Sequence, residues 1–354
     1  TAKSVQDFTE LAKLVDLTNS KLQTMPEILA QLAPRDAALI ALEEELVGIA
    51  GKLQVAAGNL RQFNDVDDQI WSQTARATRD AADRARELTY LTWWTNPWKR
   101  FGSHQAPTAL NAEAVTLRLA VNDYQPVALM VTNVTAEPMD VRVRLMHPKA
   151  KKKQGRYTGH FVTPPSWATV RQALMVEPEY APDSEYPSML AALPSSQTMA
   201  VAPGQTRQIW IDVDTAGMRP GEYPGILELQ PQNDRPQRDV RLTLKVEDVV
   251  LPEKVPAEVF CWGNYPLGML GENPEMSQAE INRLHQPWLE EMVKHGINRL
   301  LMNSQRFKPA FNKEDTLAAP IDFAFWDKLF NSKRRYAENF VGGYSVAHYH
   351  MPKK

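Results

Sequence analysis

Three groups of polar and aromatic residues near the end of the chain are of the types that bind sugars. Each group follows a short apolar segment, at the point where a predicted strand ends: Trp262, Asn264 and Tyr265; Asn303, Ser304 and Gln305; His348, Tyr349 and His350. Aromatic rings stack on the C–H faces of sugars, while amide and imidazole groups exchange hydrogen bonds with hydroxyls. These residue types indicate a carbohydrate-binding site. Ordinary loop residues around a buried tryptophan are the alternative interpretation.

Metal binding and acid–base catalysis have weaker support from the same region. His348 and His350 lie on one side of an extended strand and would need a third ligand to hold a metal. We find no third ligand and expect no metal or other cofactor. Glycosidases generally use two carboxyl groups that flank the scissile bond. The acidic residues here lie in predicted loops or near helix starts, which leaves the catalytic residues unknown: Glu272, Glu275, Asp315 and Asp322.

Residues 257–354 alternate between predicted strands and helices. Strands are expected at 258–262, 297–302 and 341–349, with helices at 277–295 and 321–337 between them. This order predicts parallel strands with right-handed crossovers, as in the first βα units of a (β/α)8 barrel. Ligands of such barrels meet the carboxyl ends of the strands, where the three polar groups lie. Because a complete barrel takes ~250 residues, we expect this region to be only part of one and the chain to be a fragment.

Residues 101–250 are predicted to form an antiparallel β-sandwich. Apolar and polar residues alternate over 115–121, 141–145, 209–213 and 240–246, and turn residues separate these segments. A basic run at 149–156 is predicted as a hairpin tip, with binding of an anionic polymer as the alternative. Residues 251–256 contain two prolines and are predicted to be a linker.

Residues 1–100 are predicted to form a helical hairpin or bundle. Leu39, Leu42, Leu46 and Ile49 recur on one side of an amphipathic stretch. These helices are either a packing module or a surface for self-association or partner binding. A cluster of aromatic residues ends this part of the chain and is interpreted as a plug between domains or as a platform for sugar rings: Trp93, Trp94, Trp98 and Phe101.

Composition and motifs exclude several classes of function. The formal net charge of −2 argues against nucleic-acid binding by bulk charge, and no apolar segment is long enough to span a bilayer. Cys261 is the single cysteine, which excludes an internal disulfide and a cysteine-based zinc cluster. The sequence has no phosphate-binding GxxxxGK loop, no GxGxxG, no HExxH and no GxSxG. Nucleotide hydrolysis, dinucleotide binding, zincin chemistry and nucleophile-elbow hydrolysis therefore have no support.

The order of these parts resembles a known group of bacterial enzymes. The segments GEYPGILELQPQ, RLTLKVEDVVLPEKVP and HGINRLLMN are similar to those of glycoside hydrolase family 123 and its uncharacterised neighbours. The resemblance covers about 111–354 and implies a β-sandwich followed by a TIM barrel, in a secreted, periplasmic or cell-surface protein. It also implies action on glycans that contain N-acetylhexosamine. The family's adjacent Asp-Glu pair does not occur after Ala257, so no catalytic residue is carried over.

Two functions are therefore expected to compete. The chain is either part of a glycoside-hydrolase-like protein that acts on or binds glycans, or a non-catalytic structural or glycan-binding surface protein. A complete small α/β domain at residues 257–354, completed by oligomerisation, is a third possibility. The partner expected in the first two cases is carbohydrate, and whether the chain is an enzyme stays open.

Overall fold

The computed structural model describes residues 5–61, 68–112, 114–147, 152–153, 156–157, 165–176, 186–194, 196–232, 235–252, 260–262, 277–294, 299–301 and 316. They belong to two compact units, Thr1–Val249 and Val250–Lys354, each of which is described by itself. None of the described helices is long and apolar enough to cross a membrane.

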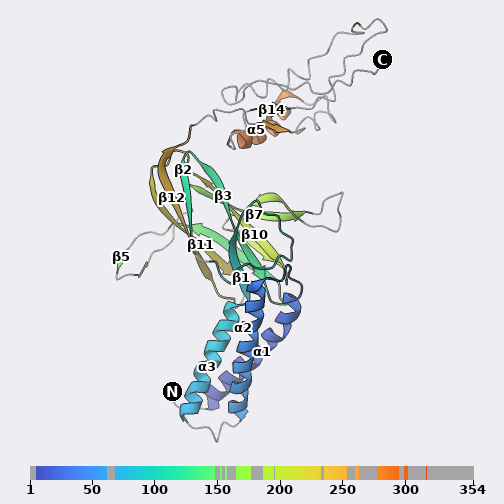
Figure 1. The fold of residues 1–354 in the computed structure, drawn as a ribbon, viewed down its shortest axis with the longest axis vertical. Coiled ribbons are helices and arrows are strands. Elements are labelled where there is room, and N and C mark those ends of the chain that lie inside the picture. Colours follow the sequence, from blue (N-terminus) through green and yellow to red (C-terminus); the bar gives the residue numbers. More distant parts are fainter. Residues whose placement is uncertain are drawn as a thin grey trace. The chain divides into compact units, whose positions relative to one another are not determined.

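The first unit begins with helices, as the sequence predicts. They are α1 (Val5–Leu29), α2 (Ala37–Arg61) and α3 (Asp68–Glu87), and Figure 1 shows them side by side. Asp36 begins α2, because its carboxylate accepts hydrogen bonds from the backbone nitrogens of Ala38 and Leu39 at 3.1 and 3.2 Å. The predicted apolar side of α2 is confirmed as buried: Leu39, Leu42, Leu46 and Ile49.

Two five-stranded sheets follow the helices in the same unit. The first has the strand order β1-β3-β10-β7-β8 and the second has the order β2-β12-β11-β4-β9. The bounds of the first are β1 (Tyr90–Thr95), β3 (Tyr124–Asn133), β10 (Thr206–Asp214), β7 (Ala168–Val176) and β8 (Tyr186–Ala192). Those of the second are β2 (Val115–Val121), β12 (Arg238–Val250), β11 (Gly221–Pro231), β4 (Met139–Met146) and β9 (Thr198–Val201).

The predicted alternation of apolar residues is confirmed in these sheets. In the first sheet β3 pairs antiparallel with β1 and β10, and β7 pairs antiparallel with β10 and β8. In the second sheet β11 pairs antiparallel with β12 and β4. Every second residue of β4 and β10 enters one core shared by both sheets: Val141, Val143, Leu145, Ile209, Ile211 and Val213. The basic run contributes a short antiparallel pair, β5 (Lys152–Lys153) and β6 (Arg156–Tyr157).

The tryptophan-rich segment, interpreted above as a plug between domains or as a platform for sugar rings, begins in a strand of the first sheet. Trp93 and Trp94 lie in β1, which pairs with β3 from Tyr90 opposite Asn133 to Thr95 opposite Ala128. Aromatic residues and threonine favour the pleated, half-buried surface of a strand, which explains why the chain becomes extended directly after α3. These tryptophans are therefore part of the first sheet, on whose two faces their side chains alternate.

The second unit contains one described strand–helix–strand segment. Strand β13 (Phe260–Trp262) pairs in parallel with β14 (Arg299–Leu301), and α5 (Gln278–Lys294) lies between them in the sequence. Ser277 is the predicted N-cap of α5: its hydroxyl accepts from the backbone nitrogen of Glu280 at 3.3 Å. The predicted helix at 321–337 and strand at 341–349 lie outside the described residues. The complete barrel and the sequence-based domain boundaries stay predictions.

Candidate functional site

The sugar-binding residues predicted from the sequence lie almost wholly outside the described part of the chain. Trp262 is the last residue of β13, and only its backbone is described. The other predicted residues lie outside the described part of the chain: Asn264, Tyr265, Asn303, Ser304, Gln305, His348, Tyr349 and His350. The site that these residues would form stays a prediction.

The described residues contain another candidate, on the outer face of the first sheet. Ile209, Ile211 and Val213 of β10 point into the shared core, so the alternate residues of the strand point away from it. Those outward residues are Gln208, Trp210 and Asp212, which are 1%, 6% and 5% exposed. A buried amide, a buried indole and a buried carboxylate on an outward face require cover from another part of the chain.

The register of the first sheet extends this face into a row across all five strands. Gln208 lies opposite Met130 on β3, and Met130 lies opposite Trp93 on β1. On the other side of β10, Ile209 lies opposite Gln172 of β7. This register places Gln208 level with Ala173 of β7. Ala173 in turn lies opposite Leu190 on β8. The row is aromatic and apolar except for the amide of Gln208.

The segment from Asn96 to Ala106 crosses this outer face and provides the cover. At its start, the Asn96 side chain accepts a hydrogen bond from the backbone nitrogen of Trp98 at 2.9 Å. At its end, the carbonyl oxygens of Ser103 and Gln105 accept from the backbone nitrogen and hydroxyl of Thr206, at 2.6 and 2.7 Å. The first hydrogen bond closes a turn that includes Trp98, and the other two attach the end of the crossing segment to β10.

A groove lies beside the crossing segment, above strands β10, β7 and β8. Its volume is about 280 Å³ and its lining residues are Pro97, Trp98, Lys99, Arg100, Ala173, Pro187, Leu190, Gln208 and Trp210. The Trp98 ring meets the Trp210 ring edge to face, with 5.1 Å between centroids and 86° between planes. Trp98 is 70% exposed, so the groove combines a fixed ring with an open ring face.

Trp210 is oriented by a charged network beneath the groove. Its indole nitrogen donates to Oδ1 of Asp212 at 2.7 Å, and Nε of Arg171 donates to Oδ2 at 2.6 Å. Burial by itself would raise the pKa of Asp212. Hydrogen bonds from Arg171, Tyr124 and Trp210 outweigh burial, so that the pKa of Asp212 lies below its ordinary value. The carboxylate stays ionised and holds Trp210 in place.

Gln208 supplies an unsatisfied hydrogen-bond donor in the groove. Its side-chain nitrogen is buried and has no hydrogen-bond partner among the described residues. Leaving such a buried donor unpaired costs about 1–3 kcal/mol. Gln208 is among the residues that line the groove, so a turn of its side chain toward the groove would let this nitrogen donate to an oxygen atom of a ligand placed there.

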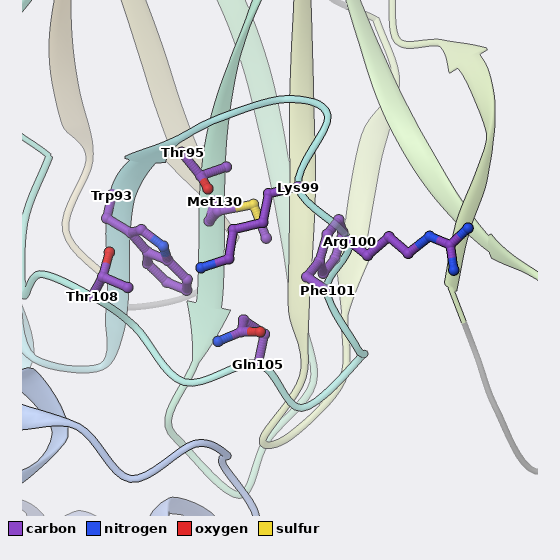
Figure 2. Close-up of a pocket in the computed structure, with 8 residues that line it drawn as sticks. All are labelled: Trp93, Thr95, Lys99, Arg100, Phe101, Gln105, Thr108 and Met130. Atoms are coloured by element: carbon purple, nitrogen blue, oxygen red, sulfur yellow. The ribbon is translucent and has the colours of Figure 1, made fainter.

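A second, much smaller pocket lies on the other side of the crossing segment. Its volume is about 10 Å³, close to the space of one water molecule. Figure 2 shows that the Lys99 side chain extends across this pocket toward Trp93 and Gln105, whereas Arg100 points the opposite way. Lys99 and Arg100 line both the small pocket and the larger groove.

Metal binding receives no support from the described residues, which include no group of three or more histidine, cysteine, aspartate or glutamate side chains able to hold an ion. Among the described residues that line the groove there is no acidic side chain.

Comparison with solved structures finds a likeness in fold to a known enzyme. The chain resembles a family 123 glycoside hydrolase. That enzyme comes from Clostridium perfringens and hydrolyses glycolipid glycans; the match has a TM-score of 0.52 at 11% identity, over 70% of this chain and 46% of the enzyme. At this identity the match shows the fold alone. This chain spans less than half of that enzyme's length.

The remaining comparisons add no argument about function. CfaE, the adhesive subunit of the CFA/I fimbria of enterotoxigenic Escherichia coli, matches with a TM-score of 0.25 at 11% identity, over 46% of this chain and 50% of CfaE. No family model matches this chain, and no curated protein matches its sequence.

Sequence reasoning found part of the groove and missed the rest. Trp98 belongs to the aromatic cluster interpreted above as a possible platform for sugar rings. Gln208, Trp210 and Asp212 were missed, although a signal existed. They occupy the positions of an alternating strand where solvent-facing residues are expected, and an outward tryptophan there signals a covered or ligand-binding face.

Proposed function

We propose that this chain binds glycans through the groove beside Trp98, as part of a glycoside-hydrolase-like protein. The observation that carries the proposal is the exposed Trp98 ring, set edge to face on buried Trp210 beside the unpaired amide of Gln208. Trp98 is 70% exposed. When a sugar ring stacks on it, much of its apolar surface is removed from contact with water, which favours binding.

The geometry suits a sugar ring better than a purely apolar ligand. A sugar presents C–H groups on its face and hydroxyl groups at its edge. The face would stack on Trp98, while an edge oxygen would accept the hydrogen bond that Gln208 has to offer. Prepositioned aromatic rings bind with little loss of side-chain entropy, because Trp210 already restricts Trp98.

The likeness to the family 123 hydrolase supports a wider proposal about the whole protein. In this proposal a barrel follows the sandwich, and the sugar-binding residues predicted near 262–265, 303–305 and 348–350 lie at its strand ends. The protein would then act outside the cytoplasm on glycans that contain N-acetylhexosamine. The sandwich groove would hold the glycan, while hydrolysis would take place in the second unit.

A non-catalytic glycan-binding protein is the second candidate. It is favoured by the lack of acidic side chains among the described residues that line the groove, because hydrolysis generally needs a pair of carboxyl groups. The two candidates share the groove and differ in what the rest of the protein does.

Screening the chain against a panel of glycans tests the proposal. The panel contains N-acetylhexosamine oligosaccharides, neutral glucans and galactans, and acidic polysaccharides, with affinity measured by calorimetry. We expect Trp98→Ala to weaken binding at least about tenfold, and Trp98→Phe to weaken it less because a ring is kept. Leu17→Ala is the control, since Leu17 is an exposed apolar residue of α1 at 53%.

The outcomes separate the possibilities. Equal affinity of the wild-type chain and the Trp98→Ala variant would overturn the groove as the binding site. Release of reducing sugar by the chain would favour the hydrolase, and binding without release would favour the non-catalytic protein.

A further inference from the structure

The corner between α1 and α2 is paired with the crossing segment that covers the groove. The backbone nitrogen of Ala33 donates to the carbonyl oxygen of His104 at 2.9 Å, and the backbone nitrogen of Ala106 donates to the carbonyl oxygen of Ala33 at 2.8 Å. These two hydrogen bonds form a parallel bridge between Ala33 and Gln105. The helices are therefore attached to the crossing segment by the kind of pairing that joins parallel strands.

The crossing segment is attached to β10 through the hydroxyl group of Thr206. Thr206 is fully buried, and its hydroxyl donates to the carbonyl oxygen of Gln105 at 2.7 Å. Because a hydroxyl has one hydrogen, the Thr206 oxygen accepts in its 2.7 Å contact with the hydroxyl of Thr132 on β3. Gln105 thus links the helical corner, through its bridge to Ala33, to the first sheet.

The Thr206 attachment and the groove share one face of one strand. Thr206, Gln208 and Trp210 occupy alternate positions of β10, so their side chains leave the same face. From Thr206 to Trp210 the strand rises about 14 Å, at about 3.4 Å per residue. Gln105 is bound at the first of these residues, and Trp98 packs on the last. The strand and the crossing segment therefore close a loop of chain, and Gln208 within it lines the groove.

Phe101 connects this attachment to Trp98. Its side chain is buried in a small cluster with Trp93 and Met130 of the first sheet. Only Lys99 and Arg100 separate Phe101 from Trp98 along the chain. The attached part of the crossing segment therefore restrains Trp98 over a short stretch of backbone.

We infer that Thr206 and the corner at Ala33 are positioning elements of the glycan groove, so that glycan binding and the helical corner are coupled. This inference rests on the proposed function. A ring that is held before the ligand arrives loses less entropy on binding, so a looser attachment weakens binding. Coupling is reciprocal, so a glycan that holds Trp98 also stabilises the hydrogen bonds that join Ala33 and Ala106.

The glycan affinity of threonine variants tests the role of Thr206. The probe is the N-acetylhexosamine oligosaccharide of highest affinity in the panel, and calorimetry measures its binding. Thr206→Val keeps the shape of the side chain without the hydroxyl and is expected to weaken binding about fivefold, the effect of one hydrogen bond. Thr206→Ser keeps the hydroxyl and is expected to bind as the wild-type chain does.

Thr215→Val is the matched control, because it also removes a buried hydroxyl. Thr215 is fully buried, and its hydroxyl donates to the carbonyl oxygen of Ala120 at 2.7 Å. It directly follows β10, at the end opposite Thr206. Both valine variants should lose stability to urea, whereas Thr206→Val alone should lose affinity. An equal loss of affinity in the two variants would show an effect of stability and would overturn the positioning role.

Hydrogen exchange of backbone amides tests the corner itself. Exchange at Ala33 and Ala106 should slow when the oligosaccharide is bound, and in the free chain it should be faster in Thr206→Val than in Thr215→Val. Glycan binding that Thr206→Val leaves unchanged would overturn this inference alone, as would binding that leaves exchange at the corner unchanged. A wild-type chain that binds no glycan of the panel would overturn the proposed function, and this inference with it.

Discussion

The indole nitrogen of Trp210 donates a hydrogen bond to the carboxylate of Asp212 at 2.7 Å. Both residues lie on the outward face of β10, and Arg171 on β7 donates to the other carboxylate oxygen at 2.6 Å. This pairing fixes the ring against which Trp98 packs. The shape of the groove therefore depends on a carboxylate that does not line it.

Replacing this carboxylate by an amide is expected to destabilise the sandwich and weaken glycan binding. Asp212→Asn keeps the shape of the side chain but removes the negative charge that accepts the hydrogen bonds of Arg171 and Trp210, at a cost of about 2 kcal/mol in the free energy of unfolding. Urea denaturation measures this loss. Asp239→Asn is the matched control, because Asp239 is an exposed carboxylate on β12. Equal midpoints for the two variants would contradict the role of Asp212.

The same residue predicts how stability depends on pH. The pKa of Asp212 in the folded chain lies below its ordinary value, so the folded state binds the proton less readily than the unfolded state. The contribution of Asp212 is therefore complete above the ordinary carboxyl pKa of about 3.9 and is lost as the pH falls below it. Between pH ~5 and ~3, the wild-type chain should lose more stability than Asp212→Asn does. Parallel curves for the two proteins would show that Asp212 does not carry this dependence.

Arg238 is expected to be necessary for holding α3 to the sandwich. Its guanidinium group lies 4.2 Å from the centre of the Tyr90 ring and donates to the carbonyl oxygen of Glu87 at the end of α3. Arg238→Ala should lower the free energy of unfolding by about 2–3 kcal/mol. Arg238→Lys should recover little of it, because an ammonium group cannot cover the ring and reach the carbonyl in the same way. Arg241→Ala, at an exposed position of the same strand, should change the thermal midpoint little.

A side chain at Gly204 is expected to be unfavourable, for two separable reasons. Its φ of +65° disfavours any residue with a Cβ atom, and an added methyl group would lie 2.9 Å from Oε1 of Gln31. Gly204→Ala should therefore cost about 1–2 kcal/mol of folding free energy. Gly217 has a similar φ of +68° but no neighbour within 4 Å, so Gly217→Ala reports the backbone cost alone. Adding Gln31→Ala should restore part of the folding free energy that Gly204→Ala loses. It should restore none of the folding free energy that Gly217→Ala loses.

The sequence predicted the elements whose period is regular. Leucines at helical spacing identified the core side of α2, and alternation identified β4 and β10, because burial of one side imposes a period on the residue types. The sequence did not predict β1. Only Leu88 and Thr89 separate α3 from β1, and neither is a glycine or a proline.

The groove could be predicted only in part, because it depends on pairing between distant segments. Trp98 is conspicuous in the sequence, but its neighbour Trp210 is more than a hundred residues away. Their contact requires both the register of β10 against β3 and the hydrogen bonds that carry residues 96–106 across the sheet. Local patterns in a sequence do not report such a register.

The most direct test of glycan binding at this groove is a titration followed by NMR of the tryptophan indole groups. With the glycan that binds best in the panel, the indole signals of Trp98 and Trp210 should shift in a saturable manner. The signal of Trp71, which is buried among the helices, should stay in place. Binding by calorimetry that leaves the Trp98 and Trp210 signals unchanged would contradict the account.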